Sequence, residues 1–442
     1  MVKFAQMPKY EAYKDSGVEW VKEIPDEWEV IKLKFLVDIF NGDSLAPALK
    51  DKFSSFDQNQ RAYIASKDIS LSTSEVDYDN GIRIPLDHAE YRIAPARSSL
   101  LCIEGGSAGR KIAFTNQSVS FVNKLACFSG EQVSNKFIYY SLFAELFQTQ
   151  FKLSMSGLIG GVAISSIRNF LVTLPPQKVQ LLIINFLDQK TAQIDAAITI
   201  KEQQIELLKE RKKIIIQQAV TQGLDPNVPM KDSGVEWIGQ IPEYWEVTRF
   251  KNLFSQSRLP IRMEDDVVTS YRDGQVTLRS NRRLDGYTEA ILEGGYQGVR
   301  VGQLVLNSMD AFEGAIGVAE SDGKCTPEYV ICDPVKEDVL PDYFAYLLRE
   351  MALARYIQVI CNAVRQRAVR IRFNNLATRF IVFPPKSEQD SIVKYIEIES
   401  KKIEYSIQHT KEQIQKLKEY KTTLINSAVT GKIKITPEML QA

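Results

Sequence analysis

The sequence predicts an α/β (α+β) chain. We expect two globular modules of mixed or antiparallel β-strands plus helices, separated by two long antiparallel coiled-coil helices. Three observations predict this: an internal duplication, a heptad-like helical pattern in each copy, and stretches rich in short β-like runs between them. Because the pieces recur in the same order, we expect pseudo-two-fold symmetry between the halves.

The duplication is clearest in a short tryptophan motif. Residues 14–20 read Lys-Asp-Ser-Gly-Val-Glu-Trp, and residues 231–237 repeat them unchanged. Ile-Pro and Trp-Glu-Val follow in both copies, and the four tryptophans of the chain all fall inside these motifs. Chance does not place seven identical residues and every tryptophan in register, so the chain contains two related halves.

A long helix is predicted in each half. Each begins after a Pro-Pro pair, Pro175-Pro176 or Pro384-Pro385, and ends near a glycine that can adopt the left-handed conformation, Gly223 or Gly431. Each would run for roughly 40 residues, or about 60 Å. Apolar residues recur in steps of three and four at matching places in both copies, and they define a seam: Ile183, Ile194, Ile198, Ile205, Leu208, Ile215, Ile392, Ile403, Ile407, Ile414, Leu417 and Leu424.

The matched seam favours two helices that pack on each other over two helices that cover separate cores. We expect a first globular module at 1–170, a helical spacer at 171–230, a second module at 231–380 and a second spacer at 381–442. Each module should contain about 135 variable residues, with short strands broken by Gly, Asn, Asp and Pro.

Composition excludes several classes of protein. The 55 basic and 55 acidic residues cancel, so a uniformly basic nucleic-acid coat is excluded, although a local basic surface is not. Five cysteines without a C-x-x-C pair and two histidines signal neither a disulfide framework, nor a metal site, nor a Ser-His-Asp triad. The absence of a long apolar run argues against a membrane, and we expect a cytoplasmic protein.

No catalytic motif stands out. Residues 105–111 form a glycine-rich stretch that ends in Arg110 and Lys111, but the final Gly-Lys-Ser/Thr of a nucleotide-binding loop is missing. A turn between strands with both cations at the surface is the favoured interpretation over a phosphate site. We find no methyltransferase tetrapeptide and no nuclease cluster, and therefore expect no catalytic residue, metal or cofactor in this chain.

Local basicity is informative. Residues 351–387 contain no Asp or Glu, and residues 369–373 alternate as a half-buried strand would, with two arginines on one face. Arginine reads base edges and neutralises phosphates, so DNA is favoured over a solvated cationic face or ion pairs. The candidate DNA-binding residues are Arg110, Lys111, Lys124, Arg272, Arg279, Arg282, Arg283, Arg365, Arg367, Arg370 and Arg372.

The chain resembles the specificity subunits of type I restriction–modification systems. Both tryptophan motifs look like the beginning of that family's target-recognition domains, and Pro384-Pro385 with Glu388-Gln389 is similar to its junction into a conserved helix. The resemblance covers essentially the whole chain. The first junction departs from the pattern, because Val179 stands where Glu is usual.

The resemblance implies a non-catalytic subunit that reads an asymmetric, bipartite double-stranded DNA site, one half per domain, with the helices setting the gap. It implies two modification subunits, which bind S-adenosylmethionine and methylate adenine, and restriction subunits that use ATP and Mg. Two alternatives come from other classes: a diverged DNA methyltransferase or nuclease, and a coiled-coil scaffold with two protein-binding heads. Cofactor binding by the isolated chain tests the first, and salt-dependent DNA binding tests the second.

Overall fold

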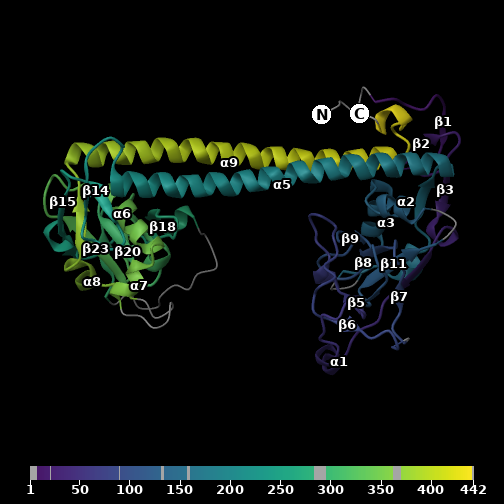
Figure 1. Ribbon diagram of the computed structural model, residues 1–442, viewed down its shortest axis with the longest axis horizontal. Helices are drawn as coiled ribbons and strands as arrows, with labels where there is room; N and C mark the ends of the chain where they lie inside the picture. The colour runs from purple at the N-terminus through teal and green to yellow at the C-terminus, as the bar shows by residue number, and fades with distance from the viewer. Residues whose placement is uncertain are drawn as a thin grey trace. The chain divides into compact units, whose positions relative to one another are not determined.

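A computed structural model describes residues 7–19, 21–88, 90–130, 134–156, 160–282, 295–361 and 370–440. The chain divides into two compact units. Unit 1 comprises Met1–Glu202 and Lys411–Ala442, and unit 2 comprises Gln203–Thr410. Each unit contains a β-rich body and a part of two long helices, α5 (Gln177–Gln222) and α9 (Lys386–Val429) (Figure 1).

The two long helices pack together with antiparallel directions, as the sequence predicts. In unit 1 the Lys421 ammonium group lies 2.7 Å from the Asp195 carboxylate. In unit 2 the Lys212 ammonium group lies 2.6 Å from the Glu404 carboxylate. Residue numbers therefore fall along α9 as they rise along α5, and the predicted fold class is confirmed.

Local sequence sets the ends of both helices. The first helical N–H groups bond to the carbonyls of the preceding prolines: Val179 donates to Pro176 at 2.8 Å, and Glu388 donates to Pro385 at 2.9 Å. Gly223 follows α5 with φ +79°. A proline before the first turn and a left-handed glycine after the last are typical of helix ends.

Apolar burial follows the seam along both helices. The deeply buried positions are Ile183, Ile194, Ile198, Ile205, Ile392, Ile403, Ile414 and Leu424. The half-buried positions are Leu208, Ile215, Ile407 and Leu417. Burial of this kind is the main source of helix stability in a protein.

The body of unit 1 consists of two four-stranded sheets packed face to face around one apolar cluster. The first is antiparallel, in the order β4 (Asp38–Asn41), β11 (Leu125–Ser129), β8 (Ser99–Cys102), β9 (Ile112–Phe114). The second is mixed, in the order β6 (Arg83–Ile84), β5 (Arg61–Ile64), β10 (Val119–Phe121), β7 (Ile93–Ala94). Two strand pairs complete the unit, β1 (Tyr13–Asp15) with β2 (Glu23–Pro25) and β3 (Glu29–Lys32) with β12 (Leu171–Leu174).

The body of unit 2 contains a four-stranded antiparallel sheet in the order β16 (Phe254–Ser257), β23 (Tyr329–Pro334), β20 (Leu304–Asn307), β21 (Ile316–Val318). Four antiparallel pairs surround it: β13 (Met230–Asp232) with β14 (Gln240–Pro242), β15 (Glu246–Arg249) with β24 (Phe380–Phe383), β17 (Val268–Ser270) with β18 (Val276–Leu278), and β19 (Gln297–Val299) with β22 (Gly323–Cys325).

Shorter helices lie beside these sheets. In unit 1 they are α1 (Pro47–Lys52), α2 (Asn135–Ser141), α3 (Glu145–Leu153) and α4 (Ile164–Ile167). In unit 2 they are α6 (Pro341–Leu353), α7 (Tyr356–Ile360) and α8 (Phe373–Ala377). Single 3₁₀ turns are η2 (Leu33–Phe35), η3 (Ser66–Asp68), η4 (Phe250–Asn252), η5 (Arg279–Asn281), η6 (Ala311–Glu313) and η8 (Pro437–Leu440). None of the described helices has the length and hydropathy needed to span a bilayer.

The internal duplication extends into the variable bodies. The order β4-β11-β8-β9 in unit 1 corresponds to β16-β23-β20-β21 in unit 2, although the two stretches share little sequence. The second tryptophan of each motif, Trp28 or Trp245, is fully buried. The Trp245 indole nitrogen donates to Glu388 at 3.0 Å, whereas in unit 1 the Trp28 ring lies edge-on to Tyr10 with centroids 5.7 Å apart. The departure at Val179 therefore coincides with a different environment for the buried tryptophan.

Candidate nucleic-acid interface

In unit 2 a loop at residues 308–314 joins β20 to β21 and meets both predicted arginine clusters. Its path is fixed locally: the Asn307 side chain accepts from the Met309 N–H at 3.2 Å, and η6 ends at Gly314 with φ +96°. The loop carries Asp310 and Glu313. A short turn that leaves the end of a sheet strand is a common carrier of binding residues, because the strand holds its base rigidly.

One side of this loop contacts the segment that precedes α8. The Ile371 N–H donates to the Ser308 carbonyl at 3.2 Å, and the Ser308 hydroxyl donates to the Ile371 carbonyl at 2.7 Å. Ile371 is fully buried, while Arg370 and Arg372 on either side of it are exposed. Both arginines therefore project away from the core.

The predicted strand at residues 369–373 is wrong for its described part. Residues 370–372 are not in a strand, and Phe373 begins α8 with Arg372 as its N-cap. The Arg372 N–H donates to Asn375 at 2.8 Å, which turns the chain into the helix. The alternation that suggested a strand comes from one buried isoleucine between two exposed arginines.

The other side of the loop contacts the turn between β17 and β18. The Arg272 guanidinium lies 3.0 Å from the Asp310 carboxylate and also pairs with Glu313. These carboxylates raise the pKa of Arg272. A Cβ on Gly317 would lie 1.9 Å from the Gly274 carbonyl oxygen, so the turn approaches β21 at backbone contact.

The other described arginines of the two clusters also contact neighbouring side chains. Arg282 forms an ion pair with Asp273 at 2.8 Å, and its guanidinium carbon lies 4.1 Å from the centroid of the Tyr271 ring. The Arg279 Nε donates to Thr269 at 3.4 Å. Arg370 is 4.0 Å from Glu328, the residue whose carbonyl accepts the Ser308 N–H.

The structure thus brings together two clusters that lie far apart in the sequence, on either side of residues 308–314. Three further candidates, Arg283, Arg365 and Arg367, lie outside the described residues. Exposed arginines paired with carboxylates can exchange those partners for phosphates, because the pairs are solvated and weak. The arrangement can bind a polyanion and donate to base edges.

Unit 1 has the corresponding loop after β8. The Val162 N–H donates to the Ile103 carbonyl at 3.0 Å, and the Gly105 N–H donates to the Gly160 carbonyl at 2.9 Å. The glycine-rich turn at residues 105–111 therefore pairs with the segment of Gly160, Gly161 and Val162, which precedes α4. Val162 is buried in the position that Ile371 takes in unit 2.

The three predicted cations of unit 1 lie in or near this turn, and they differ in exposure and in their partners. Arg110 is exposed. The Lys111 ammonium group donates to the Ser66 carbonyl at 2.6 Å and helps to hold the turn. Lys124 forms an ion pair with Glu104 at 3.2 Å. The residues form a turn between strands, and Lys111 is half-buried rather than free at the surface.

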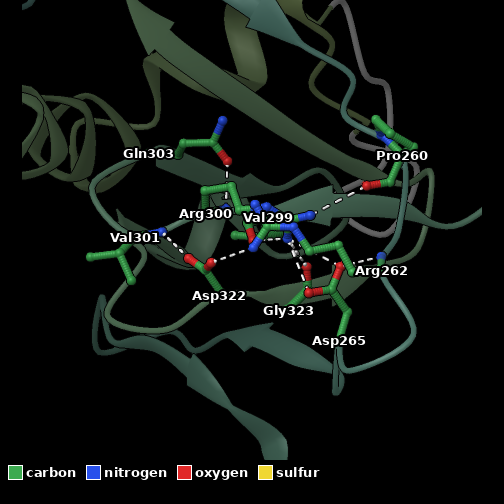
Figure 2. Close-up of polar contacts among 9 residues, drawn as sticks. All are labelled: Pro260, Arg262, Asp265, Val299, Arg300, Val301, Gln303, Asp322 and Gly323. Carbon is green, nitrogen blue, oxygen red and sulfur yellow. Dashed lines mark hydrogen bonds and ion pairs between the residues drawn. The ribbon is translucent and has the colours of Figure 1, made fainter.

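One further arginine of unit 2, Arg300, has a structural role that sequence reasoning missed. Figure 2 shows Arg300 bound to both oxygens of Asp265 at 3.1 Å and to the carbonyls of Val299 and Gly323. The Asp265 side chain is almost fully buried, as is most of Arg300. Removing either partner of such a pair is expected to destabilise the fold, because it leaves a buried charge. No local sequence signal distinguishes Arg300 from the exposed arginines.

A cavity of about 680 Å³ in unit 1 was also missed. It lies among residues 71–74, α2 and the long helices. The Lys136 ammonium group lies 4.5 Å from the Phe114 ring centroid and 3.4 Å from Asp188, and Lys421 pairs with Asp195. These two lysines are paired with carboxylates of the same unit, so we assign the pairs a structural role.

Reactive side chains are not assembled in the described part of the chain. Burial raises the pKa of Cys127 and of Cys325 to about 12, which keeps both thiols protonated. No group of three or more His, Cys, Asp or Glu residues among those described is placed to hold a metal ion. The loops after β8 and β20 can therefore contribute hydrogen bonds and charged groups to a ligand.

Comparison with known proteins gives these loops a context. Residues 25–210 match the family described as "Type I restriction modification DNA specificity domain". Residues 25–210, a little under half of the chain, are therefore similar to the DNA specificity domain of type I restriction–modification systems.

Solved structures agree on the fold. A chain from "Structural basis underlying complex assembly and conformational transition of the type I R-M system" has 14% identity and a TM-score of 0.62, with 93% of this chain and 99% of that chain covered. The HsdS subunit from Thermoanaerobacter tengcongensis has 14% identity and a TM-score of 0.53, with coverages of 93% and 98%. Both likenesses extend over the two units and both long helices, beyond residues 25–210.

Proposed function

We propose that the chain reads an asymmetric, interrupted DNA site, with one half-site bound by each unit. Recognition is assigned to residues 1–170 and 231–380, and the helical segments 171–230 and 381–442 set the gap. The observation that carries this proposal is that the two units share one arrangement of strands and loops but place different residues in the loops. Both units use the loop after the corresponding strand, β8 or β20, against a segment before a short helix, but one junction is glycine-rich and the other arginine-rich.

Different side chains on one frame favour two unlike half-sites. Arginine reads guanine bidentately, whereas a glycine-rich junction allows close approach of backbone donors to the duplex. Phosphate contacts fix the register of a protein on DNA, and base contacts select the sequence. The cations proposed for these contacts are Arg110, Lys111, Lys124, Arg272, Arg279, Arg282, Arg283, Arg365, Arg367, Arg370 and Arg372.

We further propose that the long helices recruit two modification subunits, and through them restriction subunits. A second apolar row faces away from the seam: on α5 Leu207 and Ile214 are exposed one heptad apart, and on α9 Ile398 and Tyr405 are exposed at the same spacing. Solvated apolar rows of this kind are typical of a helix that binds partner helices. S-adenosylmethionine, ATP and Mg are assigned to the partner subunits.

The test is methylation mapping with the intact complex. The isolated chain, given S-adenosylmethionine, should neither methylate nor cleave DNA. Co-purified with its modification subunit, it should direct adenine methylation to one bipartite motif. Methyl transfer by the chain alone, or methylation without sequence preference in the complex, contradicts the proposal.

A further inference from the structure

Two carboxylates from one loop hold the guanidinium group of Arg272. Its Nη2 lies 3.0 Å from the Asp310 carboxylate, and its Nη1 pairs with Glu313. Arg272 belongs to the turn between β17 and β18, whereas both acids belong to the loop at residues 308–314. The pairing therefore joins two of the segments that form the candidate interface.

The three side chains are fixed in place but open to solvent. The Asp310 carboxylate also accepts from the Asn307 side-chain amide at 3.3 Å, and a Cβ on Gly314 would lie 3.0 Å from the Arg272 carbonyl oxygen. The exposed fraction is 62% for the Arg272 side chain, 36% for Asp310 and 38% for Glu313. A ligand can therefore reach a guanidinium group whose orientation is set in advance.

The stability of the fold does not account for this arrangement. Ion pairs between exposed side chains contribute little to the free energy of unfolding, because both groups stay solvated. The loop is held by its own backbone: the Gly314 N–H donates to the Ala311 carbonyl at 3.0 Å, and the Ala315 N–H donates to the Asp310 carbonyl at 3.2 Å. Two acids beside one arginine of a polyanion interface therefore need another explanation.

The charge of the group opposes contact with a phosphate. Arg272 carries one positive charge and the two carboxylates carry two negative charges, so the three side chains sum to −1. A phosphate beside Arg272 would be repelled by both carboxylates. A single solvated pair can give way to a phosphate, but here two partners on one loop would have to leave.

The hydrogen-bonding groups suit the edge of a G·C base pair. An arginine has five N–H donors. The contacts with Asp310 and Glu313 occupy two of them, so three remain among the described contacts of Arg272. Guanine N7 and O6 accept two N–H groups from one guanidinium, and a carboxylate oxygen accepts from the amino group of cytosine.

We infer that Asp310 and Glu313 commit Arg272 to reading guanine in a G·C pair of the half-site bound by unit 2. This inference rests on the proposed function, in which each unit binds one half-site. Arg272 is the residue that touches the base. The two carboxylates are positioning residues, because they fix the direction of the guanidinium group and keep phosphates away from it.

The experiment uses the full-length chain co-purified with its modification subunit. Methylation of a library of random duplexes gives the motif of the parent, and affinities are then measured for duplexes in which each base pair of that motif is replaced in turn. Asp310→Asn and Glu313→Gln each remove one charge and keep the shape of the side chain. Glu337→Gln is the matched control, since Glu337 is exposed in unit 2 and its side chain forms no hydrogen bond or ion pair with the described residues.

Each acid variant should lose about tenfold or more of its discrimination at one G·C pair, and Arg272→Ala should relax the same pair. The other half-site should be read as before. Binding to a duplex without the motif should become tighter in the acid variants, and its salt slope should become steeper by about one, because the released Arg272 can then bind a phosphate. The control should change neither quantity.

Acid variants that keep the discrimination of the parent at every base pair overturn the inference. Arg272→Ala also overturns it if the variant binds all duplexes more weakly by the same factor, which is the behaviour of a phosphate contact. If Asp310→Asn lowers the melting temperature, because Asp310 also holds Asn307, the result for Glu313→Gln decides. A parent complex that methylates no preferred motif contradicts the proposed function instead.

Discussion

Ile371 and Ser308 hold each other through two hydrogen bonds, one at 3.2 Å from the Ile371 N–H and one at 2.7 Å from the Ser308 hydroxyl. The contact fixes the segment of Arg370 and Arg372 against the loop that binds Arg272 through Asp310. Unit 1 repeats the first bond between Val162 and Ile103. The loops after β8 and β20, which we propose bind DNA, are therefore supported by the same backbone hydrogen bond.

Arg370→Ala and Arg372→Ala should weaken DNA binding and leave the fold intact, because both side chains are exposed on either side of a buried anchor. If they read bases, each should cost about 1–3 kcal/mol and relax one half of the motif. If they touch phosphates, binding should weaken uniformly and the salt slope should become shallower by about one. Titration at several salt concentrations distinguishes the two cases. Unchanged affinity in both variants would move the reading surface to Arg279 and Arg282.

Ile205→Asp should disrupt the helix pair. Ile205 is buried on the seam, and an unpaired carboxylate there should cost about 2 kcal/mol or more, with loss of partner assembly. Leu417→Asp should cost less, because Leu417 is half-buried. Gln204→Asp is the control: Gln204 is exposed on the same helix, and the change should alter stability by no more than about 0.5 kcal/mol. A melting temperature for Ile205→Asp equal to that of the control would mean that the seam faces water.

Glu350→Gln should change the pH dependence of stability. Burial raises the pKa of Glu350 from 4.5 to about 7 in the folded state. Between these values the folded state binds more protons than the unfolded state, so Glu350 makes stability fall as pH rises to about 7. At pH 8 the variant should be more stable than the parent by up to about 3 kcal/mol, with no advantage below pH 4.5. Urea unfolding of both proteins across this pH range measures the difference in stability. A difference that does not change with pH would contradict the raised pKa of Glu350.

A fragment of residues 1–230 should form a dimer and read a symmetric site. The fragment lacks α9, which packs on α5 in the full chain and whose Val429 carbonyl accepts from the Thr173 hydroxyl. The best substitute for α9 is the α5 helix of a second copy. Two identical readers should recognise an inverted repeat of the first half-site, with a similar gap. Light scattering and methylation mapping with the modification subunit test this. A fragment that stays monomeric at micromolar concentration is incompatible with it.

The helices and the duplication could be predicted because their signals are local and repeated. The Pro-Pro pairs, the seam and the two glycines define α5 and α9 closely, since each acts within a few residues of its own place. The common sheet order of the two bodies was not visible in sequence. It depends on apolar strands such as β8 and β20, whose residues differ but fill equivalent positions.

The state of each arginine could not be predicted, because its partners come from distant segments. Arg272 meets Asp310 across one turn, and Arg300 is buried against Asp265, yet both are arginines in polar stretches of the chain. The alternation around Ile371 correctly indicates which side chains are exposed. It does not indicate that a helix cap, rather than a sheet, holds them.

The division of the chain into compact units has a consequence for biosynthesis. Unit 2 is continuous from Gln203 to Thr410, whereas unit 1 needs Lys411–Ala442 to complete a body begun at Met1–Glu202. A ribosome therefore releases every residue of unit 2 before unit 1 can bury Ile194 against α9. The part of unit 1 that is synthesised before unit 2 can therefore finish folding only after it, and its apolar helix face needs protection from aggregation until α9 has been synthesised.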